Sequence, residues 1–76
     1  MANAYFLLRE DEVGDVDMKM MGIKAKDESF RYRIFKRKEG GYILAIRCAS
    51  VDEAHRKALW IRDKVFGDGR LYWVKE

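Results

Sequence analysis

The segment from Phe30 to Cys48 constrains the fold more than any other part of the chain, because two alternating stretches flank a Gly40-Gly41 pair. The two stretches alternate and are rich in aromatic and β-branched residues on both sides of the glycines, which is typical of strands with one buried face. Two such strands joined by a short loop that contains glycine form an antiparallel hairpin. We therefore predict a hairpin over residues 30–48.

The same pattern selects a pairing register for this hairpin. Residues directly opposite each other share a face of the sheet, and a two-residue loop at Gly40-Gly41 would pair Arg33 with Cys48 and mix the faces. A three-residue loop, Glu39-Gly40-Gly41, keeps apolar residues opposite apolar ones and places a glycine where a left-handed residue is needed. The expected pairs are Ile34 with Ile46, Tyr32 with Cys48, and Arg33 with Arg47.

A helix follows the hairpin. Ser50 and Glu53 have the spacing of a capping box, so the helix should begin at Ser50, run to about Phe66 and stop at Gly67. Apolar residues recur along it at helical spacing, which predicts a core-facing stripe: Val51, Ala54, Ala58, Ile61 and Val65. Trp60 lies off this stripe, so either the N-terminal strand or the C-terminal tail covers it, which we expect, or it faces a partner.

The remaining segments complete a single domain over residues 1–76. Residues 4–10 and 69–76 suit strands, residues 10–17 suggest an acidic loop, and residues 18–26 suggest a further strand, although their methionines also suit a helix. The predicted fold is α+β: a small antiparallel sheet of three to five strands packed on one helix. The expected order is four strands, the helix and a last strand.

Charge is distributed unevenly along the chain. Residues 1–17 carry one cation and five acids, whereas residues 18–47 carry nine cations and three acids. In the predicted register the face of the hairpin away from the core carries Arg31, Arg33, Phe35, Arg37 and Arg47. Like charges directly opposite each other destabilise a sheet. Two interpretations stay open at this point, a solvated basic face and a face that binds an anion.

The chain offers little for catalysis. Nucleophilic catalysis needs a Cys or Ser beside a base that a third group orients, and the only Cys-His pair, Cys48 and His55, has no evident third member. No metal-ligand spacing and no glycine-rich phosphate loop occurs, so we expect no enzyme activity, metal or cofactor. With one cysteine, no stretch able to span a bilayer and no signal segment, the expected location is the cytoplasm.

Residues 20–73 resemble the Apetala-like DNA-binding domain of plant ethylene-response factors. The likeness runs through "MGIKAK", "FRYRIFKR", "GGYILAIRCASVDEA" and "KALWIRDKVFGDGRLYW"; integrase arm-binding domains use a similar sheet. The resemblance implies a sheet whose exposed face enters the major groove of double-stranded DNA. The residues of the contacting kind are Arg31, Arg33, Arg37 and Arg47, with Lys24, Lys26 and Lys38 flanking them and Phe35 available for a thymine methyl group. Non-enzymatic DNA binding is the leading hypothesis.

The stretch "YILAIRCASVDEAHRKALW" and the closing strand are similar to a small phage-encoded inhibitor of bacterial RNA polymerase. That resemblance implies an alternative function: a phage protein, acting in the host cytoplasm, that inhibits a host enzyme such as RNA polymerase or a defence complex by binding to it. The acidic loop or the closing strand with Trp73 would then make the contact. A homodimer is a third possibility, because the apolar residues 5–8 could form an edge strand that pairs with a second copy.

Overall fold

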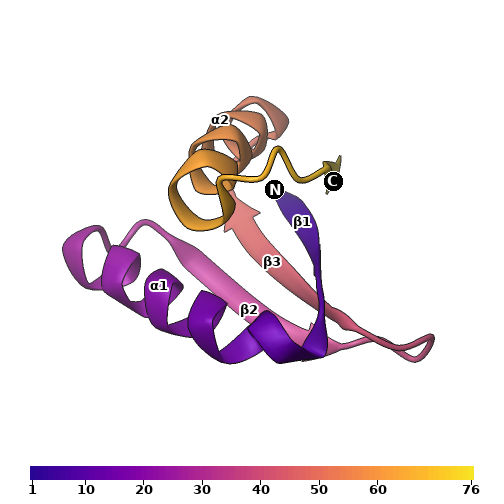
Figure 1. Ribbon diagram of the computed structural model, residues 1–76. Helices are drawn as coiled ribbons and strands as arrows, with labels where there is room; N and C mark the ends of the chain where they lie inside the picture. Colours follow the sequence, from indigo (N-terminus) through magenta and orange to yellow (C-terminus); the bar gives the residue numbers. More distant parts are fainter.

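The computed structural model describes residues 1–76, which form a four-stranded antiparallel sheet with two helices on one face (Figure 1). The predicted α+β class with a small antiparallel sheet is therefore confirmed. The strand order is β2-β3-β1-β4, so the chain has the split β-α-β-β-α-β arrangement. In chain order the elements are β1 (Ala2–Leu8), a 3-10 turn (Glu10–Glu12), α1 (Val13–Lys26), β2 (Arg31–Lys36), β3 (Tyr42–Cys48), α2 (Val51–Ile61), a π-helical turn (Arg62–Phe66) and β4 (Tyr72–Lys75).

Strand β1 lies inside the sheet, between β3 and β4. Its alternate residues Ala2, Ala4, Phe6 and Leu8 are buried against the helices, as its apolar pattern requires. Both of its edges are hydrogen-bonded within the chain, so this strand has no free edge. The expectation that residues 5–8 form an edge strand is therefore wrong, and the free edges of the sheet belong to β2 and β4.

The structure corrects the prediction for residues 10–26. Instead of an acidic loop followed by a strand, they form the 3-10 turn and the 14-residue helix α1, which adds a second helix to the predicted fold. Val13, Val16, Met20 and Ile23 recur at helical spacing, and Val16 and Met20 are buried. Of the acids that suggested a loop, three form the 3-10 turn before α1, and Asp15 lies in the first turn of α1, where a carboxylate interacts favourably with the helix dipole.

The hairpin is confirmed, but its register is shifted from the predicted one. Ile34 lies opposite Leu44 and Tyr32 opposite Ile46, and Arg31 rather than Arg33 faces Arg47. The three-residue loop begins one residue earlier than expected, at Lys38, because Gly40 rather than Gly41 closes the turn. Gly40 N donates to Arg37 O (3.3 Å) and adopts a positive φ of 101°. The assignment of residues to the two faces is unaffected, because the shift moves each partner by two positions.

Helix α2 follows the prediction. Ser50 Oγ accepts a hydrogen bond from Glu53 N (3.1 Å), and the π-helical turn ends at the left-handed Gly67 (φ 65°). Four residues of the predicted stripe are buried and Val51 is partly so. Trp60 differs from expectation, because neither β1 nor the C-terminal tail covers it and 45% of it is exposed.

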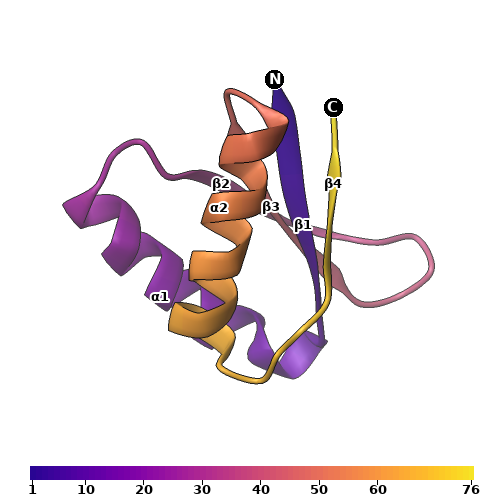
Figure 2. The ribbon, with the colours of Figure 1, turned by 90° about the horizontal axis from the view of Figure 1, so that it is seen from above.

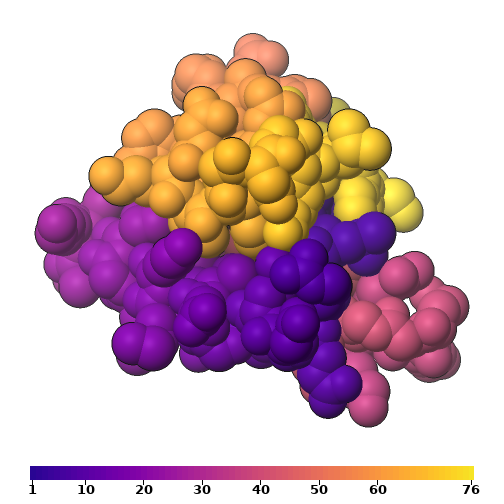
Figure 3. Space-filling view, in the orientation of Figure 1, coloured from indigo at the N-terminus to yellow at the C-terminus, as the bar shows by residue number.

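Both helices cover the same face of the sheet and leave the other face bare (Figure 2). The largest fully buried side chains come from the two central strands and from both helices: Phe6, Leu44, Ile46, Met20 and Ile61. In the space-filling view α1 and α2 lie next to each other over this core (Figure 3). Neither helix is long and apolar enough to cross a membrane.

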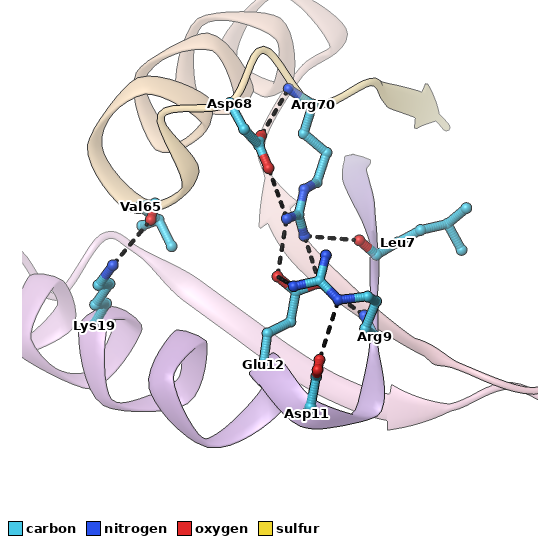
Figure 4. Close-up of polar contacts among 8 residues, drawn as sticks. All are labelled: Leu7, Arg9, Asp11, Glu12, Lys19, Val65, Asp68 and Arg70. Atoms are coloured by element: carbon cyan, nitrogen blue, oxygen red, sulfur yellow. Dashed lines mark hydrogen bonds and ion pairs between the residues drawn. The ribbon is translucent and has the colours of Figure 1, made fainter.

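One of the acids near the N-terminus, Glu12, helps to hold the fold together through hydrogen bonds from Arg70 (Figure 4). Arg70 donates to both carboxylate oxygens of Glu12 at 2.8 and 2.9 Å, and also to Asp68 and to the carbonyl oxygen of Leu7. Hydrogen bonds from Arg70 hold the pKa of the Glu12 carboxyl below its usual value. This cluster fastens the end of β1 and the start of α1 to the loop before β4.

Candidate nucleic-acid interface on the outer face of the sheet

The bare side of the sheet, called the outer face below, is organised in three rows that run across the strands. Residues opposite each other in the observed registers share this face, so the rows follow directly from the pairing. The first row holds Arg31, Arg47, Asn3 and Lys75; the second holds Arg33, Ala45, Tyr5 and Trp73; the third holds Phe35, Ile43 and Leu7. The face therefore changes from basic to aromatic to apolar along the strands.

The cations of the outer face have few partners within the chain. Arg31, Arg33, Arg47 and Lys75 make no ion pair, and Arg47 contacts only the sulfur of Met1 (3.6 Å). No carboxylate lies in any of the three rows. Arg31 and Arg47 lie directly opposite each other on neighbouring strands, an arrangement that costs stability when no anion lies between them.

Aromatic rings lie beside these cations. Tyr5 and Trp73 form a cross-strand pair with ring centroids 5.4 Å apart and an angle of 23° between the ring planes, and 38% of Trp73 is exposed. Asn3 Nδ2 donates to the Tyr5 hydroxyl (3.1 Å). On the other side of the face the Arg33 guanidinium lies 5.3 Å from the centroid of the Phe35 ring. Aromatic rings thus lie next to guanidinium groups that make no ion pair.

A shallow hollow of about 520 Å³ lies between the two sets of side chains. Ala45 contributes to its lining from the middle of the second row, where a larger residue would fill the space between Arg33 and Tyr5. Arg31, Arg47 and Asn3 surround the same hollow. A planar group placed there would meet an aromatic ring on one side and guanidinium groups on the other.

The predicted contact residues are only partly brought together. Arg31, Arg33, Phe35 and Arg47 share the outer face. Arg37 lies at the hairpin end, where it is paired with Glu39 (3.0 Å), and Lys38 is in the loop. Lys24 and Lys26 belong to α1 on the helical side, where Lys24 lines a hollow shared with Arg31 and Arg33 and Lys26 lines the space between the helices.

Sequence reasoning missed the contribution of β1 and β4 to this face. Tyr5, Asn3, Trp73 and Lys75 join the arginines only through the pairing of the first strand with β3 and β4. The alternation within residues 2–8 signals which side chains share a face. It contains nothing that identifies the neighbouring strands.

The remaining reactive side chains do not form a second site. Cys48 is buried in the core, and burial raises the pKa of its thiol. His55 Nδ1 lies 3.0 Å from the Tyr72 hydroxyl on the exposed side of α2. No cluster of three or more His, Cys, Asp or Glu side chains has the geometry to hold a metal ion.

Neither a protein-family model, nor a curated protein, nor a solved structure matches the chain.

Proposed function

We propose that the protein binds single-stranded nucleic acid on the outer face of its sheet. The observation that carries the proposal is the Tyr5–Trp73 pair, of which Trp73 is exposed and Tyr5 partly exposed, beside four cations that have no carboxylate partner. Proteins that bind single strands combine a basic surface that follows the backbone with aromatic rings on which bases stack. The outer face supplies both groups within neighbouring rows.

Each part of the outer face has a defined role in this proposal. The first row binds phosphates through Arg31, Arg47 and Lys75, while Tyr5 and Trp73 stack bases. Arg33 lies between the two regions, where a guanidinium can hold a phosphate or stack on a base. Stacking of one base on an aromatic side chain is worth about 1–3 kcal/mol.

The width of the sheet favours a single strand over the double-stranded DNA expected from the sequence. Four strands spaced about 4.8 Å apart span roughly 14 Å between the outer strand axes, whereas the major groove is about 12 Å wide. A β2–β3 ribbon alone would fit that groove, but Tyr5 and Trp73 would then contact no base. A splayed single strand can reach the whole face.

The test is fluorescence-anisotropy titration with labelled oligonucleotides of about 12 residues, within the range covered by small single-strand-binding domains. We expect tighter binding to unstructured DNA or RNA than to a duplex of the same length, and loss of about tenfold or more in Trp73→Leu. Trp60→Phe, which changes the other tryptophan on the helical side, is the matched control and should bind like the wild type.

Two results would contradict the proposal. One is the absence of binding at low salt by protein whose circular dichroism shows it to be folded. The other is stronger binding to the duplex that Trp73→Leu leaves unchanged, which would favour insertion of the β2–β3 ribbon into the major groove. Comparison of the DNA and RNA oligonucleotides identifies the preferred sugar.

A further inference from the structure

We infer that the groove between α1 and α2 is a second binding site, which takes an acidic peptide segment of a partner protein with an apolar anchor side chain. This interhelical groove has a volume of about 730 Å³. One end of the groove is closed by a hydrogen bond that Lys19 Nζ donates to the carbonyl oxygen of Val65 (3.2 Å). Toward the C-terminal end of α1 the two helices diverge (Figure 2). The groove lies on the helical side, so it is separate from the outer face.

The groove exposes an aromatic surface that no other part of the chain covers. Trp60 is 45% exposed, and its ring packs in a tilted arrangement on Phe30, with centroids 5.3 Å apart. Ile23 of α1 and the buried Val65 of the π-helical turn complete the apolar lining of the groove. An aromatic side chain that is well supported yet half exposed is a typical anchor point of a protein interface.

Unpaired cations surround this apolar surface. Lys26, Arg56 and Lys64 line the groove and make no hydrogen bond or ion pair within the chain. The one carboxylate in the lining, Asp27, accepts hydrogen bonds from Ser29 and makes no ion pair with these cations. The charge complementary to this rim is negative, and a partner that supplies Asp or Glu side chains would pair with all three cations.

Gly22 provides room for the anchor. It lies inside α1 and lines the groove, and a Cβ atom built on it would meet nothing within 4 Å. Glycine in a helix interior is less stable than alanine, and no internal contact at this position requires it. The absent side chain leaves this part of the groove, which Trp60 also lines, open to an incoming residue.

The combination of an apolar surface and a basic rim favours a peptide over a nucleic acid. A single-stranded nucleic acid would pair its phosphates with the cations and could stack a base on Trp60, but it has no aliphatic side chain to place against Ile23 and Val65 between the two helices. An acidic amphipathic segment satisfies both features, in the manner of a helix that lays its apolar side in a hydrophobic groove. The stretch of α1 from Lys19 to Lys26 advances about 10 Å, which matches about two turns of such a segment.

The experiment uses Trp60 as a reporter. In the Trp73→Phe variant Trp60 is the only tryptophan, and the probe is a synthetic peptide of about 12 residues, or about three turns, with glutamates and a leucine at every third or fourth position. We expect a saturable blue shift of Trp60 emission. The double substitution Arg56→Glu/Lys64→Glu should weaken binding by about tenfold or more, and Gly22→Leu should block the groove.

Lys24→Glu/Lys38→Glu is the matched control, because it makes the same total charge change at two lysines outside the groove and should keep the affinity. The inference is overturned if the peptide gives no saturable change up to about 1 mM, the limit of weak binding. It is also overturned if a peptide with glutamine in place of glutamate binds equally well. A single-stranded oligonucleotide that shifts Trp60 more than the acidic peptide does would reassign the groove to nucleic acid.

Discussion

The salt dependence of nucleic-acid binding should report how many outer-face cations meet phosphates. Four of them make no ion pair with a carboxylate, so none of these contacts has to be broken when they bind a phosphate: Arg31, Arg33, Arg47 and Lys75. Each phosphate contact contributes about 0.7 to the slope of log K against log salt for a single strand. If all four engage phosphate, the slope should be about −2.8, and it should fall to about −1.4 in the double variant Arg31→Gln/Arg47→Gln.

The same double variant should not lose stability. Arg31 and Arg47 lie opposite each other, and removing a cross-strand pair of like charges gains on the order of 0.2–1 kcal/mol. Glutamine keeps part of the aliphatic stem, so strand packing is preserved. Urea unfolding followed by circular dichroism should therefore show an unchanged or slightly higher midpoint together with the weaker, less salt-dependent binding.

A control variant distinguishes the loss of phosphate contacts on the outer face from a general loss of positive charge. Arg56→Gln, which removes an arginine on the helical side, should leave the salt slope within error of the wild type. An equal reduction of the slope by Arg56→Gln would show that the phosphates do not lie on the outer face. A double variant that unfolds at clearly lower urea would show that the opposed arginines stabilise the sheet, contrary to the argument.

Other predictions concern the fold. Arg70→Ala should destabilise the protein by about 2–4 kcal/mol, because it removes a bidentate pair with Glu12 and a ring contact with Phe66. Thermal unfolding measures this change, and a loss of stability under about 0.5 kcal/mol would contradict the prediction. Because the pKa of Glu12 is lowered in the folded state, its contribution is present above the pKa of an unfolded glutamate and is lost as the pH falls through the lowered value; urea midpoints should therefore fall more steeply with acid in wild type than in Glu12→Gln. Gly22→Ala should raise the free energy of unfolding by about 0.5–1 kcal/mol, since nothing obstructs its Cβ; an unchanged urea midpoint would argue against this. The buried thiol of Cys48 should react with a disulfide reagent only on unfolding, and rapid reaction in native buffer would show the core to be open there.

Local sequence patterns predicted those parts of the fold that depend on neighbouring residues. The alternation around Gly40 was sufficient for the hairpin and its faces, and Ser50 with Gly67 was sufficient for the bounds of the second helix. The same pattern was not sufficient for the pairing register. Both glycines adopt a positive φ, so either could close the turn. A shift of the partner strand by two positions also leaves every side chain on the same face of the sheet. Sequence alone therefore placed the wrong arginine opposite Arg47.

The first helix and half of the candidate site were missed for different reasons. An apolar stripe at helical spacing is present in α1 at Val13, Val16 and Met20. It was not recognised, because acidic residues precede it and two glycines interrupt it, and both features are also typical of loops. The positions of Tyr5 and Trp73 depend on pairing between strands at opposite ends of the chain, and nothing in the local pattern specifies such pairing. Sequence therefore identified the three arginines of the outer face, but neither Lys75 nor the Tyr5–Trp73 pair beside them.

The central position of β1 has a consequence for how the protein reaches its native state. This strand comes first in the chain, yet its neighbours β3 and β4 follow much later, and Asn3 pairs with Lys75. The β2–β3 hairpin can close early, whereas β1 joins it only by pairing with β3 from the middle of the chain, and the sheet is complete only when the two ends of the chain meet. Folding dominated by such distant contacts is slow, and until it finishes the apolar β1 exposes two unpaired edges, which makes this strand the segment most prone to aggregation during synthesis.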